Sequence, residues 1–249
     1  MGYRVVIIVL SFGLITISAL SGIAPKEGPV PLYPGDHPAP DILEYRNGIS
    51  SPWSEYFTFE PASHPKLVQL RREYALDDIV RHATNDLGRA VALKNWIAAQ
   101  VRFEKPSPDV YKDWCALTIL QKARNNESLW CGQCATIYQQ CCMAIGLPAR
   151  FIECGPPANP ANHFTTEVFL KEYSKWAVID PTALPEFNLY YTVAGIPQSA
   201  LELHRHLVNR TLDLVREIHQ NYDCSINTNS PGRNFYYLRW FTRMDVITR

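Results

Sequence analysis

The sequence has no excess charge of either sign, because 24 Lys and Arg residues are balanced by 24 Asp and Glu residues. Domains that bind nucleic acid usually present a strongly basic face, so we expect no nucleic-acid partner. The chain also has no internal repeats and no low-complexity tracts. With 249 residues, 47% of them hydrophobic, it is long enough for one sizeable core with extensions.

Long apolar runs are missing except at the N-terminus, where Arg4 precedes an uncharged stretch that reaches Ala24. About 20 apolar residues can span a bilayer or form the core of a cleaved signal. We therefore interpret residues 1–24 as a signal peptide or membrane anchor. Residues 20–23 lack the cysteine of a lipoprotein anchor. Either interpretation predicts a secreted, periplasmic or membrane-anchored domain on the non-cytoplasmic side, in contact with the membrane if the segment is uncleaved.

A cysteine-rich segment carries the first chemical signal. Residues 130–135 lead into a helical pattern that stops at Gly146 and Pro148, since glycine ends helices and proline prevents their continuation. Apolar or small side chains recur on one face of this helix, at Cys134, Tyr138, Cys141, Cys142 and Ile145. The pattern puts Cys134 in the first turn, where unpaired N–H groups and the helix dipole favour a thiolate. Cys134 is therefore the predicted nucleophile.

A base and its partner follow in the sequence. Residues 163–170 and 176–182 form two strand patterns separated by a short polar turn. A hairpin folded at this turn brings Asp180 close to His163. The chain thus supplies a thiol, an imidazole and a carboxylate, the groups that an activated cysteine nucleophile requires.

These motifs together resemble the transglutaminase-like branch of the papain-like cysteine enzymes. The matching pieces are Gly132-Gln133-Cys134, Gly146-Leu147-Pro148-Ala149-Arg150, His163 with Glu167, and residues 176–182. The resemblance covers roughly residues 66–184. It implies an α+β fold with a papain-like core, in which helices pack on a small antiparallel sheet.

The resemblance also implies acyl transfer on a peptide or protein amide bond, without a cofactor or metal. Cys134 would attack the carbonyl, His163 would move the proton, and Asp180 would orient the imidazole. The oxyanion would face the backbone N–H of Cys134 and a second donor, for which Gln133, Trp114 and Trp130 are the candidates. Whether the acceptor is water, as in a peptidase or amidase, or an amine, as in a transamidase, is left open by the sequence.

Two alternatives belong to other functional classes. Residues 130–134 also resemble the Trp-Cys-Gly-x-Cys motif of thioredoxin-like oxidoreductases, in which Cys131 and Cys134 would form the redox pair. An inert transglutaminase-like scaffold for partner binding is the second alternative. A zinc site is disfavoured because three of the clustered cysteines share one helix.

The other expectations concern cysteine pairing and domain limits. Seven cysteines in an exported chain predict disulfides among most of the six that are not the nucleophile, with Cys131 oxidised. Residues 25–60 are predicted as a proline-rich spacer with an aromatic arm, and residues 61–184 as the transglutaminase-like domain. Residues 185–249 are predicted as a helical extension packed on the core, with a helix over residues 199–220.

Overall fold

A computed structural model of the chain describes residues 8–9, 61–111, 113–155, 163–182, 190–219, 223–225 and 237–241. The predicted spacer and arm, residues 25–60, lie outside these ranges, as does most of the predicted export segment. Within that segment, Ile8–Val9 form the short strand β1. In the described part of the chain, no helix combines the length and the apolar character needed to cross a membrane.

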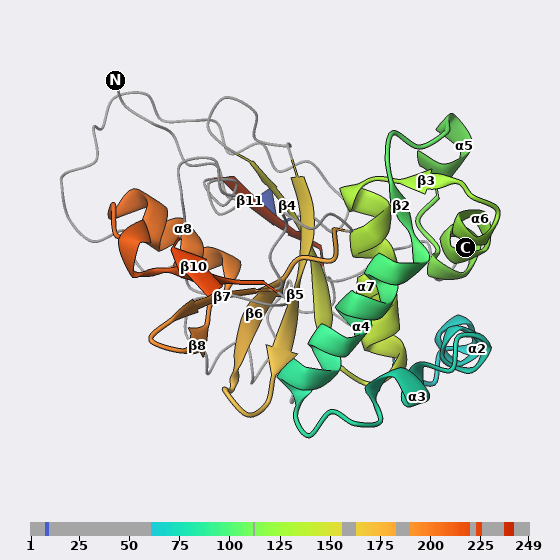
Figure 1. Cartoon of the computed structure of the whole chain (residues 1–249), viewed down its shortest axis with the longest axis horizontal. Coiled ribbons are helices and arrows are strands. Elements are labelled where there is room, and N and C mark those ends of the chain that lie inside the picture. Colours follow the sequence, from blue (N-terminus) through green and yellow to red (C-terminus); the bar gives the residue numbers. More distant parts are fainter. Residues whose placement is uncertain are drawn as a thin grey trace.

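The described elements form a mixed α+β fold, as predicted (Figure 1). Its helices are α2 (Pro65–Glu73), α3 (Leu76–Val80), α4 (Asp86–Gln100), α5 (Pro108–Tyr111), α6 (Ala116–Arg124), α7 (Cys131–Ala144) and α8 (Ala200–Val208). Its strands after β1 are β2 (Arg102–Phe103), β3 (Ser128–Leu129), β4 (Ala149–Gly155), β5 (His163–Leu170), β6 (Lys175–Ile179), β7 (Tyr190–Val193), β8 (Ile196–Pro197), β9 (Arg216–Ile218), β10 (Asp223–Ser225) and β11 (Tyr237–Phe241). A short 3₁₀ turn spans Leu212–Leu214.

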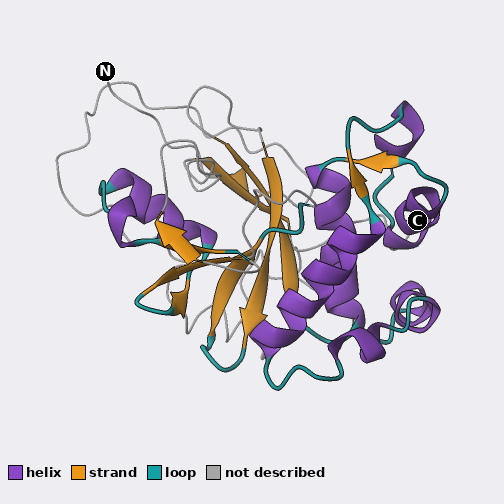
Figure 2. Ribbon diagram, in the orientation of Figure 1, coloured by secondary structure: helices purple, strands orange, loops and turns teal. Residues whose placement is uncertain are grey.

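The main sheet has the strand order β1-β11-β4-β5-β6-β7-β9-β10, with β8 paired to β7. Its pairs are antiparallel except for β1 and β11, which run parallel. Strands β5 and β6 form the predicted hairpin, with Leu170 opposite Lys175 and Thr166 opposite Ile179. Figure 2 shows the sheet with α4 and α7 on one side and α8 on the other. Helix α8 belongs to the region predicted as a C-terminal extension packed on the core, so the predicted core itself has its helices on one side.

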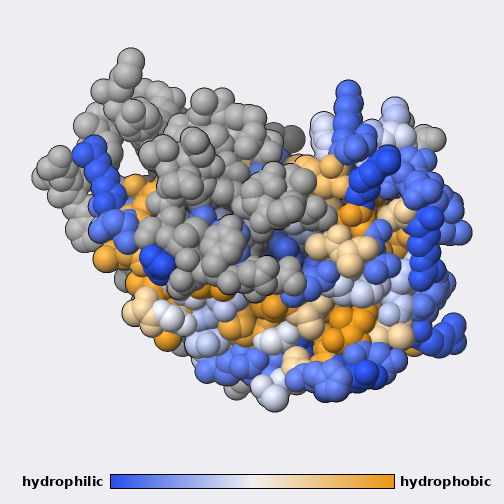
Figure 3. All heavy atoms as spheres, in the orientation of Figure 1, coloured by the Kyte–Doolittle hydropathy of each residue, from blue (hydrophilic) through white to orange (hydrophobic). Residues whose placement is uncertain are grey.

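Side-chain alternation along the strands explains the two helical layers. Ala177 and Ile179 of β6 pack into the large core with α4, α6 and α7, whereas Val178 packs with Leu203 of α8. Successive strand residues point to opposite faces, so one strand can support both layers. On the outer side, hydrophilic residues cover α2, α5 and α6 (Figure 3).

Hydrogen bonds from neighbouring elements fix helix α7 in its middle and at its C-terminal end. The hydroxyl of Tyr138 donates to the carbonyl of Ala90 in α4 at 2.9 Å, although the tyrosine is fully buried. At the C-terminal end, Arg89 donates to the carbonyl of Ile145 at 2.7 Å, where a cation complements the helix dipole. Gly146 follows with φ +76°, the left-handed conformation that ends the helix as predicted.

The C-terminal region departs from its prediction. The helix expected over residues 199–220 ends at Val208, because Arg210 adopts a left-handed conformation with φ 57°. The chain then forms β9 and β10, and β11 joins the sheet beside β4. The helix prediction was therefore wrong beyond Val208, and the described residues that follow add strands to the sheet.

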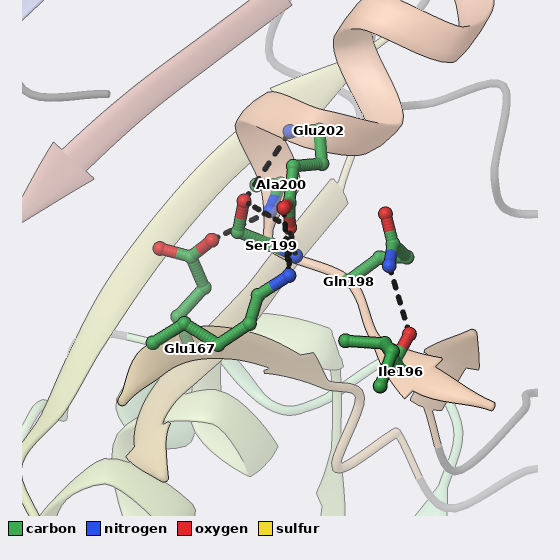
Figure 4. Close-up of polar contacts among 7 residues, drawn as sticks. Glu167, Ile196, Gln198, Ser199, Ala200 and Glu202 are labelled. Atoms are coloured by element: carbon green, nitrogen blue, oxygen red, sulfur yellow. Dashed lines mark hydrogen bonds and ion pairs between the residues drawn. The ribbon is translucent and has the colours of Figure 1, made fainter. Parts of the chain in front are cut away.

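A buried carboxylate ties α8 to the sheet. Glu167 of β5 accepts from Nε of Arg150 in β4 at 2.5 Å and from the backbone N–H of Ala200 at 2.6 Å. Figure 4 shows Glu167 beneath the first turn of α8, where Ser199 and Glu202 cap the helix. The side chain of Glu167 is 0% exposed. Its hydrogen bonds to Arg150 and Ala200 therefore compensate for the solvation that the carboxylate loses on burial.

Replacing this carboxylate should be costly. Glu167→Gln is expected to lower the free energy of unfolding by about 3 kcal/mol, because it leaves a largely buried guanidinium without its counter-charge. The matched control is Asp77→Asn, which breaks an exposed arginine pair with Arg71 and should cost less than about 1 kcal/mol. Urea unfolding measures both. Equal losses in the two variants would contradict the structural role of Glu167.

Candidate active site

The N-terminus of α7 is built around Cys131. The residue before it, Trp130, is extended, and Cys131 is the first helical residue. The first intrahelical hydrogen bond runs from the N–H of Cys134 to the carbonyl of Trp130 at 3.0 Å. The backbone N–H groups of residues 131–133 therefore lack helical acceptors, as at any helix start. Together with the helix dipole, they make this end favourable for negative charge.

The predicted imidazole and carboxylate are in contact. Nε2 of His163, the first residue of β5, lies 2.6 Å from Oδ2 of Asp180, just past the end of β6. The other carboxylate oxygen accepts from the backbone N–H of Thr182 at 2.9 Å. Both side chains are almost fully buried, so the pair is shielded from water. The hairpin thus does what its sequence pattern predicts.

The thiol at this imidazole belongs to Cys131. His163 makes a side-chain hydrogen bond with Cys131, and because Nε2 faces Asp180, the nitrogen left for sulfur is Nδ1. Burial lowers the pKa of His163, but the charge of Asp180 and the hydrogen bonds to Asp180 and Cys131 outweigh it and raise the pKa to about 10. The imidazole is therefore charged at neutral pH.

The pKa of Asp180 shifts the opposite way. Burial raises it, whereas the charge and hydrogen bond of His163 and the contacts with Thr182 lower it, and the net direction is down. The two partners therefore favour an ion pair over a neutral pair. An ionised carboxylate on Nε2 fixes that nitrogen as the donor, so Nδ1 faces the thiol.

Cys134, the nucleophile predicted from the sequence, occupies a different place. It is 0% exposed and packs in the large core under the helix, whereas Cys131 is only half-buried. Both cysteines lie in the first turn, but only Cys131 is at its open end, beside His163. The structure therefore brings Cys131, His163 and Asp180 together and places Cys134 behind them.

The three oxyanion candidates are arranged differently around Cys131. Gln133 is buried, and its Oε1 accepts from the backbone N–H of Trp130 at 3.3 Å, so the side chain closes the helix end. Trp130 is 37% exposed beside the thiol. The Trp114 ring lies over Gly132, where an added Cβ would be 3.9 Å from its Cη2. Trp114 is thus the candidate whose ring crosses the turn that holds Cys131.

Aromatic rings build one wall of this site. An added Cβ on Gly132 would also lie 3.5 Å from Cδ2 of Phe164. Phe151 packs against both Trp114 and Phe164, with ring centroids 6.0 and 5.2 Å away. Because Phe151 is almost fully buried, it anchors the two partly exposed rings.

A buried lysine, Lys94, lies near the carboxylate of Asp180. Lys94 of α4 is 7% exposed. Burial lowers the pKa of its ammonium group, and Asp180 and Cys134 oppose that shift. The Lys94 ammonium group is therefore close enough to Asp180 and Cys134 to interact with them electrostatically.

The expected disulfide framework is not present among the cysteines that the structure describes. Cys115, Cys131, Cys134, Cys141, Cys142 and Cys154 are all free thiols, so the prediction of an oxidised Cys131 is wrong in this structure. Burial raises the pKa of Cys141, Cys142 and Cys154 well above its usual range, which makes these thiols unreactive. Nor do the described residues contain three or more His, Cys, Asp or Glu side chains grouped to hold a metal ion.

Comparison with known proteins identifies the central segment. Residues 73–181 match the model of the transglutaminase-like superfamily, and this range contains Cys131, His163 and Asp180. No curated protein matches the chain.

Two solved structures are similar at low identity. A candidate cysteine protease from Cytophaga hutchinsonii matches 57% of this chain and 47% of its own, with 16% identity and a TM-score of 0.40. A candidate protease from Parabacteroides distasonis matches 66% of this chain and 31% of its own, with 12% identity and a TM-score of 0.35. The chain therefore spans less than half the length of either structure.

Proposed function

We propose that the chain is a cysteine-dependent acyl-transfer enzyme that acts on amide bonds of peptides or proteins, with its catalytic residues in the segment 73–181 that matches the transglutaminase-like superfamily. Its triad is Cys131, His163 and Asp180, with Cys131 in place of the Cys134 expected from the sequence. The observation that carries the proposal is the hydrogen-bonded chain from the Cys131 thiol through His163 to Asp180 at the open end of α7.

The first half of the reaction forms a thioester. The Cys131 sulfur attacks the amide carbonyl carbon, and the carbonyl oxygen becomes an oxyanion. The imidazolium of His163 gives its Nδ1 proton to the amide nitrogen, the C–N bond breaks, and the amine leaves. Asp180 keeps the ring oriented and stabilises its charged form.

The second half releases the acyl group. Water or an amine attacks the thioester carbonyl, His163 accepts the proton from the attacking group, and Cys131 departs. In both halves the oxyanion faces the backbone N–H of Cys131, with the indole of Trp114 as the proposed second donor. The acceptor, water or amine, decides between hydrolysis and transamidation.

The location of the enzyme is part of the same proposal. The apolar residues 1–24 support export, so the substrates would be peptides or proteins outside the cytoplasm, and an uncleaved segment would anchor the enzyme to the membrane. This part of the proposal rests on the sequence alone.

Alkylation tests the site without a known substrate. Iodoacetamide is expected to modify Cys131 faster than the other described thiols, since Cys131 is half-buried at the first position of α7 and lies beside the imidazole of His163. His163→Ala should remove that selectivity. Mass spectrometry of the peptides distinguishes Cys131 from Cys134 and from the half-buried Cys115, which serves as an internal control.

Two results would contradict the assignment of Cys131 and His163 as catalytic residues. One is alkylation of Cys131 no faster than that of Cys115, which is the behaviour expected of an inert scaffold. The other is selective alkylation that His163→Ala leaves unchanged, because the imidazole would then have no part in activating the thiol.

A further inference from the structure

A buried glutamine joins the helix of Cys131 to the segment that carries Trp114. Gln140 of α7 is 2% exposed. Its Nε2 donates to the carbonyl of Trp114 at 2.8 Å, and its Oε1 accepts from the backbone N–H of Ala116 at 2.8 Å. Both bonds have near-ideal length. They fix the backbone at Trp114 and at Ala116, on either side of Cys115.

The helix that follows this segment starts without a side-chain cap. Cys115 is the N-cap of α6 and makes no side-chain capping bond. Asp113, two residues before the N-cap, pairs with Lys122 of α6 at 2.5 Å. The glutamine therefore satisfies the N–H of Ala116, which would otherwise be an orphan donor at the helix start.

The two hydrogen bonds of Gln140 affect the active site because they determine the position of the Trp114 indole. The Trp114 ring crosses Gly132, the neighbour of Cys131, and rests edge-on against Phe151 at a ring angle of 73°. The position of the ring along the site depends on the backbone that Gln140 holds. A displacement of about 1 Å in such a group can cost about 100-fold in rate.

We propose that Gln140 is a positioning residue that sets the place of Trp114 beside the thiol of Cys131. The proposal rests on the acyl-transfer function proposed above and adds a determinant of its rate. Gln140 itself touches neither the triad nor the substrate. It acts by fixing the Trp114 backbone relative to the same helix that carries the nucleophile.

The test is the variant Gln140→Met, assayed by turnover of a peptide amide substrate. We expect kcat to fall roughly 10- to 100-fold, with KM changed much less and with the pH dependence of kcat/KM unmoved. The pH dependence should stay because the His163–Asp180 pair is untouched. Selective alkylation of Cys131 should also persist, for the same reason.

The neighbouring residue supplies a matched control. Gln139 is fully buried on the same helix, but its Nε2 donates to the carbonyl of Ala149 in β4 at 3.4 Å. Gln139→Met removes a similar buried amide without touching the Trp114 segment. It should lower thermal stability less than Gln140→Met does, because Gln139 makes one 3.4 Å bond and its Oε1 has no hydrogen-bond partner among the described residues, and it should leave kcat within about threefold of wild type.

A double-mutant cycle shows whether the effect passes through the indole. If Gln140 acts through Trp114, Gln140→Met should have little further effect on kcat in the background Trp114→Phe. Equal factors in both backgrounds would overturn the proposal. Wild-type kcat in a folded Gln140→Met protein, or the same loss in Gln139→Met, would overturn it as well.

A second variant removes the donor instead of the acceptor. Ala116→Pro eliminates the N–H that donates to Gln140, and proline is well tolerated at the first position of a helix. The preceding residue, Cys115, is already extended, with φ −111° and ψ 120°, as a residue before proline must be. We expect a smaller loss of kcat in the same direction, and an unchanged kcat would count against the proposal.

Failure of this inference is distinguishable from failure of the proposed function. If Cys131→Ala abolishes turnover but the glutamine variants do not affect it, only the positioning role is lost. If Cys131→Ala retains full turnover, the acyl-transfer site itself is wrong, whatever Gln140 does.

Discussion

Cys131→Ala is expected to lower turnover of an amide substrate by at least roughly 1,000-fold, whereas Cys134→Ala should stay within about tenfold of wild type. The reason is geometric. The thiol of Cys131 is half-buried at the first position of α7 and bonded to His163, while that of Cys134 is enclosed in the core. Removing the first thiol removes the nucleophile, and removing the second removes a small packing group.

The comparison needs both variants to be folded. Cys134→Ala leaves a small void in a close-packed core, so a modest fall in melting temperature is expected, and circular dichroism with thermal unfolding will show it. If Cys134→Ala alone abolished turnover, the assignment made from the sequence would be right. Loss of activity in both variants, together with a Cys131–Cys134 disulfide in the wild-type protein, would favour the oxidoreductase.

The sequence pattern and the structure favour different cysteines as the nucleophile. The periodic apolar face of α7 contains Cys134, Tyr138 and Cys141, and the structure buries that face completely. Membership of this face therefore argues for burial and against reactivity. Cys131 lies just before the apolar face begins, and a residue in that position can occupy the open end of the helix. In Trp130-Cys131-Gly132, a glycine beside the thiol also leaves room for Trp114 and Phe164.

Local features were predictable because their causes are local. Residues 84–86 carry a helix-capping pattern, and the side chain of Asn85 accepts from the N–H of Gly88 at 2.8 Å at the start of α4. The glycine at 146 and the hairpin between β5 and β6 follow in the same way. Each depends on a few adjacent residues, so the sequence pattern suffices.

Long-range pairing was not predictable from one sequence. The placement of β11 beside β4 joins residues 237–241 to residues 151–155, and no turn signal connects them. The contact between Gln140 and Trp114 likewise depends on how α7 and the start of α6 pack. Such contacts are set by the whole core, which is why the positioning residue appeared only in the structure.

Asp180→Asn is expected to lower kcat/KM by several orders of magnitude without unfolding the protein. In the wild type, burial alone would lower the pKa of His163, and the charge of Asp180 is the largest contribution that reverses this and raises it to about 10. An asparagine carries no charge, so burial should dominate and His163 should be neutral at pH 7. The imidazolium that stabilises the thiolate and protonates the leaving amine would be missing.

The same substitution should change the pH dependence of stability, with a defined sign. A histidine whose folded pKa lies above its unfolded value of 6.5 contributes stability that is fully present below pH 6.5 and is lost as the pH rises toward about 10. The pKa of Asp180 is lowered from 3.8, so its contribution is present above that value and is lost as the pH falls through the folded pKa. The pair therefore contributes most between about pH 4 and pH 6.5.

Urea unfolding of wild type and Asp180→Asn at pH 5.5, 8 and 10 measures this contribution. The difference in unfolding free energy should be largest at pH 5.5 and should shrink by up to about 1.4 kcal/mol per pH unit above pH 6.5. The control is Asp77→Asn: the hydrogen bond to Arg71 lowers the pKa of Asp77 below 3.8, so its contribution should stay constant between these pH values. A difference for Asp180→Asn that stays constant, or grows toward pH 10, would mean that the His163–Asp180 ion pair does not form.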